Sequence, residues 1–342
     1  MHCACQIIPR EVLERLARDR QLSEAERQAF LDTAKIDDAL RRLRSEAAAL
    51  TRTTAAFGAV REAVPAKPAI TVADCAHGTQ LPGTPIANPG ASVDPSVKSA
   101  FTETTEVANF YRTLFGRNSV DDAGSTLGSS VHYGINYNNA FWNGLRMTYG
   151  DGDGQIFTDF TRSTDVIAHE LTHGVTQYTL QLVYTNQAGG LNESLSDVFG
   201  SMFRQWRKGQ DVTQADWLIG ADIMGAAARA RGFTCLRDMA NPGHRHCLSP
   251  QPGHFRDYRN GMDPHESSGI PNLAFYKAAM AIGGKSWEVA GRIWYKAMTG
   301  GASPNMKMKT FANRTRASAR RDFAGRPAVL KAVDDAWKAV GL

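Results

Sequence analysis

The stretch Asp165-Val-Ile-Ala-His169-Glu170-Leu-Thr-His173-Gly decides the fold and marks the candidate site. Two histidines four residues apart on a helix share one face about one turn apart, so both imidazoles can bind one metal ion. Glu170 lies beside the first histidine, where its carboxylate can reach a metal-bound water without being a ligand. The apolar neighbours are Val166, Ile167, Ala168, Leu171 and Val175. They predict a buried helix, not a solvent-exposed face carrying two unliganded histidines.

A second segment, Asn-Glu193-Ser-Leu-Ser-Asp197, supplies two carboxylates four residues apart. A tetrahedral zinc site needs a third protein ligand and an open position for water, and Glu193 fits the role of third ligand. Asp197 can accept a hydrogen bond from the outer nitrogen of a ligand histidine. The surrounding leucines, valine and phenylalanine predict burial, and buried carboxylates need a cation.

Length and composition restrict the function classes. The chain has 342 residues, 42% of them hydrophobic and 21% charged, which is a globular composition and excludes disorder, collagen and coiled coil for the whole chain. No apolar stretch is long enough for a transmembrane helix, so we expect no membrane partner. Seven charged residues between Arg10 and Arg20 occupy the place of a signal peptide's apolar run. We therefore expect synthesis in the cytoplasm, and leave open both a signal-independent release and an internal role.

The net charge of +5 is concentrated at the C-terminal end, where residues 301–342 carry nine Lys/Arg and three Asp. A nucleic-acid site would interleave aromatic residues with the basic ones. The three aromatic residues of this tail lie at core-like spacing. We interpret the tail as a solvated helical face and expect no nucleic-acid partner.

The pattern along the chain predicts an α+β protein with a helical leader. Residues 1–50 are glycine-free and helical in pattern, with a capping box at Ser23–Glu26, and residues 51–77 form a proline-containing linker. Residues 78–165 are the β-rich half, with a helix over 96–115 and strands at 131–137 and 146–150. Residues 166–342 are mainly helical, interrupted by a loop-rich stretch at 232–268.

These motifs together resemble the thermolysin-like metallopeptidases. Besides HELTH and NESLSD, the matching stretches are NNAFWNG (138–144), MTYGDGDGQIF (147–157), LVYTN (182–186), SGIPNLAFY (268–276) and the C-terminal AVDDAWKAVGL. The resemblance covers about residues 78–342. The leader, with IIPREVLERLA at 7–17, resembles the short propeptide of the protealysin-like branch of that family.

The resemblance implies a zinc cleft between a β-rich and a helical half, and it implies roles for matching positions. Tyr184 and His265 would stabilise the oxyanion of the tetrahedral intermediate. Asn139 and Arg237 would hold the substrate backbone, and the carbonyl of Ala140 would accept from its amide. The apolar pocket for the side chain after the scissile bond would be formed by Phe157, Phe160, Val166, Ile219 and Leu236.

Two positions depart from the family pattern. Asn260 stands where the family has an aspartate that orients the histidine matching His265, and Asp263 is the candidate substitute. Asp165 and Asp216 match the family's double calcium site, but Arg204, Leu218 and Ala221 replace expected carboxylates. Calcium needs several hard oxygen ligands, so we expect this double site to be lost.

The predicted function is a zinc endopeptidase that is made as a zymogen and cleaves before large hydrophobic residues. Its partners would be peptide or protein substrates and its own propeptide, and we expect a monomer. An exopeptidase with the same metal site is one alternative. The other is a zinc-stabilised binding or scaffold protein whose cleft is permanently covered by residues 1–50. The intact Glu170 argues against a scaffold, because a scaffold needs no general base.

The leader is predicted to cover the cleft and to be removed by cleavage between about Leu50 and Ala73, since exposed linkers are where proteolytic nicking concentrates. A thiolate of Cys3 or Cys5 is one possible block, because thiolate is a good zinc ligand. The preferred alternative is a steric block by residues 7–13. Cys235 and Cys247 lie 12 residues apart and are able to pair in an oxidising compartment.

Overall fold

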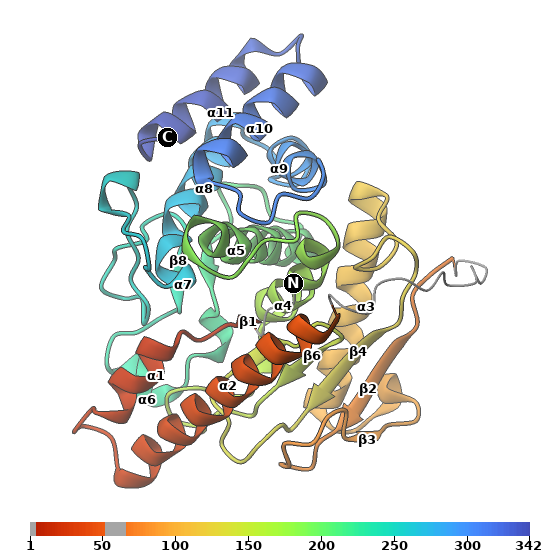
Figure 1. Cartoon of the computed structure of the whole chain (residues 1–342), viewed down its shortest axis with the longest axis vertical. Helices are drawn as coiled ribbons and strands as arrows, with labels where there is room; N and C mark the ends of the chain where they lie inside the picture. Colours follow the sequence, from red (N-terminus) through yellow and green to blue (C-terminus); the bar gives the residue numbers. More distant parts are fainter. Residues whose placement is uncertain (1–4, 52–65) are drawn as a thin grey trace.

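A mixed β-sheet and a group of buried helices meet along one central helix, α4 (Thr164–Tyr178). The computed structural model describes residues 5–51 and 66–342 (Figure 1). The strands are β1 (Cys5–Gln6), β2 (Ile70–Asp74), β3 (Thr84–Pro85), β4 (Leu127–Val131), β5 (Ala140–Trp142), β6 (Arg146–Tyr149), β7 (Leu218–Ile219) and β8 (Arg237–Asp238). Strands β7 and β8 form a separate antiparallel pair.

The larger sheet has the order β1-β5-β6-β4-β2-β3. Strand β4 pairs in parallel with β2 and with β6. The pairs β1–β5, β5–β6 and β2–β3 are antiparallel. The leader therefore supplies one edge strand, β1, to the sheet of the following domain. Its register places Cys5 opposite Trp142 and Gln6 opposite Phe141.

The remaining helices are α1 (Arg10–Ala17), α2 (Glu24–Thr51), α3 (Pro95–Phe115), α5 (Asn186–Lys208), α6 (Ala226–Ala230), α7 (Pro264–Ser267), α8 (Gly269–Ile282), α9 (Ala290–Met298), α10 (Met308–Asp322) and α11 (Pro327–Ala339). Four short 3₁₀ turns lie at Pro89–Ala91, Phe160–Arg162, Ala221–Ile223 and Phe255–Asp257. Helix α4 packs against α5, α3 and β5. The α+β prediction, with a β-rich first half and a helical second half, is confirmed.

The leader forms two helices that lie along the lower face of the molecule in Figure 1, away from the C-terminal helices. The predicted capping box at the start of α2 is present, since the amide of Ser23 donates to the Glu26 carboxylate and the amide of Glu26 donates to Ser23 Oγ. The helical prediction for 1–50 holds for α1 and α2, with the addition of strand β1 before them. Residues 1–4 and most of the predicted linker, 52–65, lie outside the described residues.

The sheet begins earlier than the sequence predicted. Strand β2 starts at Ile70, inside the stretch 51–77 that we interpreted as linker, and pairs in parallel with β4 along its whole length. Prolines at 65 and 68 concealed this strand, because they dominate the local pattern although the strand begins only after them. The predicted domain boundary at residue 78 is therefore too late.

Two other local predictions have opposite outcomes. The helix expected over 96–115 is α3, and it ends at Gly116, whose φ of 69° gives the left-handed C-cap. The strand expected at 131–137 is wrong, because β4 ends at Val131 and His132 adopts a φ of 51°, which breaks the pleat.

His132 is held between two carboxylates at this break. Its Nδ1 lies 2.9 Å from Asp151 Oδ1, and its Nε2 lies 2.9 Å from Asp94 Oδ2. Asp94 also caps α3 by accepting from the amides of Ser96 and Val97. The imidazole thus ties the end of β4 to the start of α3 and to the loop after β6.

A search of the described helices finds none long and apolar enough to cross a membrane.

His132 should make stability depend on pH. The hydrogen bond to Asp151, aided by Asp94, outweighs burial and raises the pKa of His132 from 6.5 to about 9. A group whose folded pKa is raised contributes stability below its unfolded pKa and loses it as pH rises through the folded value. Between about pH 6.5 and pH 9 the free energy of unfolding of the wild type should therefore fall by about 1–2 kcal/mol, with solvent screening taken into account. The His132→Gln variant lacks this contribution and should not show the loss.

The measurement is the difference in thermal stability between wild type and His132→Gln across this pH range. His77→Gln is the matched control, because His77 lies beside the same Asp151 but is largely exposed. A wild-type-minus-variant difference that stays constant with pH would contradict the prediction.

Candidate metallopeptidase active site

Helices α4 and α5 bring three metal-ligating side chains together. His169 and His173 lie one turn apart on α4, and their Nε2 atoms are 3.0 Å apart. Glu193 on α5 places Oε2 3.3 Å from His169 Nε2 and Oε1 3.4 Å from His173 Nε2. All three side chains are essentially inaccessible to solvent.

This arrangement fits a tetrahedral metal ion. Ligand atoms bound at about 2.0–2.1 Å around a tetrahedral zinc lie about 3.3 Å from one another. The three observed separations, 3.0, 3.3 and 3.4 Å, agree with that value. The donor set of two imidazoles and one carboxylate leaves a fourth position, as catalytic zinc sites do. The three predicted ligands thus converge on one point.

Asp197 joins the ligand helices to two further elements. Its Oδ1 lies 2.9 Å from His169 Nδ1, and its two oxygens accept from Arg237 Nη2 at 2.7 Å and Nε at 2.8 Å. Asn272 on α8 donates to the same carboxylate at 2.8 Å. Burial alone would raise the pKa of Asp197, but Arg237 and His169 hold it at about 2. The predicted role of orienting His169 through its outer nitrogen is consistent with this geometry.

His173 has orienting partners that sequence reasoning missed. Its Nδ1 lies 3.0 Å from Asn192 Oδ1 and 3.1 Å from Ser196 Oγ. Both residues belong to the NESLSD segment, next to the predicted ligand and the predicted carboxylate. The available signal was the rule that a metal-ligating histidine hydrogen-bonds through its other nitrogen, applied to the second histidine as well as the first.

His265 and Tyr184 lie at the open side of the three ligands. Asp263 Oδ1 lies 2.8 Å from His265 Nδ1 and also accepts from the His265 backbone amide. Asp263, and not Asn260, is therefore the residue that orients His265. Tyr184 donates to Glu193 Oε1 at 2.5 Å, and its hydroxyl is 3.2 Å from His265 Nε2.

Glu170 has the environment expected of a general base. Its carboxylate is fully buried, and within the described part of the chain neither oxygen has a hydrogen-bond partner of normal geometry. Burial raises the pKa of Glu170 from 4.5 to about 8. A buried carboxylate without a partner lowers the stability of the fold, so its presence beside three metal ligands indicates a catalytic role.

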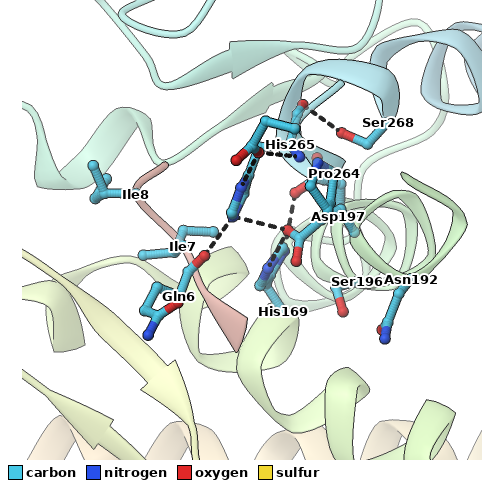
Figure 2. Close-up of polar contacts among 12 residues, drawn as sticks. Gln6, Ile7, Ile8, His169, Asn192, Ser196, Asp197, Pro264, His265 and Ser268 are labelled. Atoms are coloured by element: carbon cyan, nitrogen blue, oxygen red, sulfur yellow. Dashed lines mark hydrogen bonds and ion pairs between the residues drawn. The ribbon is translucent and has the colours of Figure 1, made fainter. Parts of the chain in front are cut away.

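The leader strand occupies the cleft with peptide-like hydrogen bonds. The Gln6 carbonyl accepts from His265 Nε2, and Figure 2 shows the Gln6 oxygen directed at that imidazole. The Ile7 amide donates to the Ala140 carbonyl at 3.0 Å, and the Ile7 carbonyl accepts from Arg237 Nη1 at 3.1 Å.

Asn139 completes this set of contacts. It accepts from the Ile8 amide at 2.9 Å and donates to the Ile8 carbonyl at 3.1 Å. The groups predicted to hold a substrate backbone, Asn139, the Ala140 carbonyl and Arg237, thus hold an extended peptide in this structure. The peptide is a segment of the chain itself.

The predicted pocket residues are all buried. Phe157, Phe160, Val166, Ile219 and Leu236 each have 0% exposure and belong to the main core. The rings of Phe157 and Phe160 are 5.6 Å apart, and Phe30 of the leader packs edge-on against Phe157 at 6.3 Å. Their role in selecting a side chain stays a prediction.

Sequence comparison decides the family. The family model for the thermolysin metallopeptidase catalytic domain matches residues 41–177, and that for the thermolysin metallopeptidase alpha-helical domain matches residues 180–342. The chain belongs to the thermolysin metallopeptidase family. It is a metallopeptidase, a hydrolase of peptide bonds.

Individual relatives agree with this assignment. The chain is 43% identical over 281 residues to an extracellular metalloprotease of Pectobacterium carotovorum subsp. carotovorum, covering 79% of this chain and 80% of the relative. It is 40% identical over 283 residues to protease PrtS of Photorhabdus sp. (strain Az29), covering 79% and 75%. Among solved structures, the precursor of protealysin from Serratia proteamaculans matches with a TM-score of 0.84 and 37% identity over 99% of both chains.

Arg204 lies where the sequence predicted that calcium ligands had been lost. Its Nη1 is 2.5 Å from Asp222 and 3.6 Å from the buried Asp165, and its Nη2 is 3.3 Å from Asp216. These three carboxylates raise the pKa of Arg204 despite its burial. One guanidinium thus faces three acidic groups, in the position of a bound cation.

We therefore predict that calcium contributes little to stability and Arg204 contributes much. A calcium-selective chelator should shift the melting temperature of the wild-type metallopeptidase only slightly. Arg204→Met should destabilise it by about 3–5 kcal/mol, because Asp165 is left as a buried, uncompensated charge.

Arg207→Met is the matched control, since Arg207 pairs with Glu103 nearer the surface and the change should cost about 0–1 kcal/mol. Both variants are compared by thermal unfolding with and without added calcium. A large stabilisation of the wild type by calcium would show that other oxygens rebuild the site.

Proposed function

We propose that this metallopeptidase is a zinc-dependent neutral endopeptidase, made as a zymogen, that hydrolyses peptide bonds on the N-terminal side of large hydrophobic residues. The observation that carries the proposal is the buried, unpaired Glu170 carboxylate beside three converging metal ligands, with an extended peptide strand in the same cleft. The relatives' names describe proteases, which supports the same activity class.

His169, His173 and Glu193 would hold the zinc ion. When bound, zinc would lower the pKa of a coordinated water and polarise the substrate carbonyl. Glu170 then accepts the proton of the attacking water and delivers it to the leaving amine. Its burial, which raises its pKa to about 8, keeps it basic enough for the first step and acidic enough for the second.

His265 and Tyr184 would stabilise the negative charge that develops on the substrate carbonyl oxygen. The contact between His265 Nε2 and the Gln6 carbonyl shows that this imidazole reaches a peptide oxygen in the cleft. Asp263 keeps Nδ1 occupied, so Nε2 is the nitrogen that faces the peptide.

Arg237, Asn139 and the Ala140 carbonyl would fix the substrate backbone after the scissile bond. Hydrogen bonding to a strand edge gives affinity without selecting side chains. We assign the selection of the substrate side chain to the five buried apolar residues Phe157, Phe160, Val166, Ile219 and Leu236. Their apolar character supports the preference for a large aliphatic or aromatic side chain.

The leader is proposed as an intramolecular inhibitor. Residues 6–8 occupy the groups that a substrate backbone would need, and Ile7 and Ile8 are themselves fully buried. The structural match to the precursor of protealysin over 99% of both chains supports a precursor form. Cleavage between about Leu50 and Ala73 would release the mature enzyme.

Contacts outside the cleft also dock the leader. Asp37 accepts from the Tyr137 hydroxyl and, at 2.8 Å, from Asn139 Nδ2. Arg15 donates to the Leu248 carbonyl, and Asp19 pairs with Arg231. Asp37 is fully buried, and sequence reasoning did not single it out.

The block is proposed to be steric. Cys5 Sγ lies within 4.8 Å of ligand atoms of His173 and Glu193, which is the position a thiol block would require. Cys5 is disulfide-bonded, however, and a disulfide sulfur is not a thiolate. The hydrogen bonds of residues 6–8 to Asn139, Ala140 and Arg237 need no thiolate at all.

Two alternatives give distinct observations. An exopeptidase needs a charged group that captures a free chain terminus. The backbone contacts of Asn139, Ala140 and Arg237 would bind an internal peptide segment as well as a terminal one. A scaffold protein with a covered cleft needs no Glu170. We further propose that the protein is a monomer made in the cytoplasm.

Glu170→Gln should abolish casein hydrolysis while keeping zinc, because it removes the base and leaves all three ligands. The expected loss is on the order of 10²–10⁴-fold, measured on protein freed of its leader, with and without a zinc chelator. Glu193→Ala should instead lose the metal. The exposed Glu288→Gln is the matched control and should keep full activity. Activity of Glu170→Gln within a few-fold of wild type would overturn the proposed mechanism, whereas chelator-resistant activity would overturn the role of zinc.

Asp37→Ala should weaken latency. It removes two buried hydrogen bonds between leader and enzyme, worth about 1–2 kcal/mol together, so activation of the intact precursor should be on the order of tenfold faster. Asp38→Ala is the matched control, because the neighbouring Asp38 contacts only leader residues among the described ones. The measurement is peptide cleavage by uncut precursor together with the time course of leader removal.

The double change Cys3→Ser, Cys5→Ser should stay latent and still mature in the same assay. An active, uncut precursor of this variant would reject the steric account in favour of the thiol block.

A further inference from the structure

A second cluster of metal-ligating side chains lies outside the cleft. Cys235 and Cys247 face one another across an isolated parallel β-bridge, and both are free and buried. Their Sγ atoms are 3.9 Å apart. The two strand-like segments that carry them therefore hold two thiols side by side in a fixed register.

His246 adds a third donor to this pair. One of its ring nitrogens and the two Sγ atoms all lie within 4.8 Å of one another. Asp238 Oδ2 is 3.0 Å from His246 Nε2 and so restrains the ring. A carboxylate bonded to a histidine is the usual support of a metal-ligating imidazole.

The spacing favours a metal ion over a bare thiol pair. Two thiolates that share a tetrahedral zinc at about 2.3 Å lie about 3.8 Å apart, close to the observed 3.9 Å. A disulfide would require the two sulfurs to approach to about 2.05 Å. A disulfide would also leave the nearby imidazole without a function, whereas a Cys₂His set is a known donor combination for zinc.

We propose that Cys235, His246 and Cys247 form a second metal site, which takes zinc or a similarly thiophilic divalent ion. The fourth ligand would be water, because both Asp238 oxygens already bind His246 and the amides of Ala240 and Asn241. Soft thiolate ligands select such ions over calcium and magnesium. The site is distinct from the His169–His173–Glu193 centre and does not depend on the proposed peptidase mechanism.

The position of the cluster suggests what the ion would do. Leu218 and Ala221, which replace expected calcium ligands, pack against the two cysteines. Cys235 is followed directly by Leu236 and Arg237, and Arg237 holds both Asp197 and the leader's Ile7. Cys247 precedes Leu248, whose carbonyl accepts from Arg15 of the leader. A metal here would fix the loop that carries these groups, in the lobe where the calcium ligands are missing.

The test uses the full chain, purified under reducing conditions. Glu170→Gln prevents self-cleavage, and Cys3→Ser, Cys5→Ser removes the two leader cysteines, of which Cys5 lies beside the catalytic ligands. This background protein should contain about two zinc ions per chain. Adding Cys235→Ser, Cys247→Ser should reduce the content to about one. Cys75→Ser is the matched control, since Cys75 is a buried free cysteine in a different cluster, and it should leave the content unchanged.

Cobalt substitution identifies the ligands. The background protein loaded with Co²⁺ should show a thiolate-to-cobalt charge-transfer absorption that the Cys235→Ser, Cys247→Ser protein lacks and the Cys75→Ser protein keeps. The catalytic centre contributes only nitrogen and oxygen donors in this background. If the serine variant fails to fold, His246→Asn replaces it, because His246 is only partly buried and the substitution should alter the cobalt spectrum and lower the affinity by about 10-fold or more.

Three results would overturn the proposal. One is a single metal ion per chain in the background protein. The second is a cobalt spectrum without thiolate charge transfer. The third is a Cys235–Cys247 disulfide, found by mass spectrometry in protein kept reduced and supplied with zinc.

Discussion

The buried ion pair between Asp197 and Arg237 is the interaction on which the rest of the site depends. Asp197 lies on α5 and Arg237 on β8, and the same carboxylate holds His169 of α4 and Asn272 of α8. Removing one partner of a fully buried pair costs about 3–5 kcal/mol, because the other charge stays buried and uncompensated. Four separate elements are thereby held in one arrangement, and Arg237 Nη1 is left to donate to the peptide in the cleft.

The interior carries more buried carboxylates than a core tolerates without cations, and the chain uses two kinds of compensation. Asp197 and Asp165 are each matched by an arginine, Arg237 and Arg204 respectively. A guanidinium is permanent and planar, so it fixes structure. Glu193 has no arginine partner among the described ion pairs and contacts imidazoles and a phenol, which suits an exchangeable metal ion with an open coordination position. Asp197 and Asp165 therefore receive side-chain cations, and Glu193 is left for the proposed metal ion.

The sequence predicted the local part of this site and missed the long-range part. Helical spacing of three or four residues places His169 with His173 and Glu193 with Asp197, so those pairs needed no tertiary information. Tertiary contacts are invisible to such spacing. Asp37 reaches Asn139 across 102 positions, and nothing in the local pattern of α2 marks it. The strand predicted at 131–137 failed for a related reason, because the alternation of apolar residues there does not encode the bridge from His132 to Asp94 and Asp151.

The leader's mode of binding would explain how a weak set of contacts in the cleft suffices for the proposed inhibition. Residues 6–8 use the backbone groups available to any extended peptide, so taken alone they would bind no better than a short substrate. Covalent attachment changes this, because a tethered segment competes at an effective concentration in the millimolar range. A cut between α2 and β2 removes that advantage without altering any contact in the cleft. The proposed activation therefore requires only that the tether between α2 and β2 be broken.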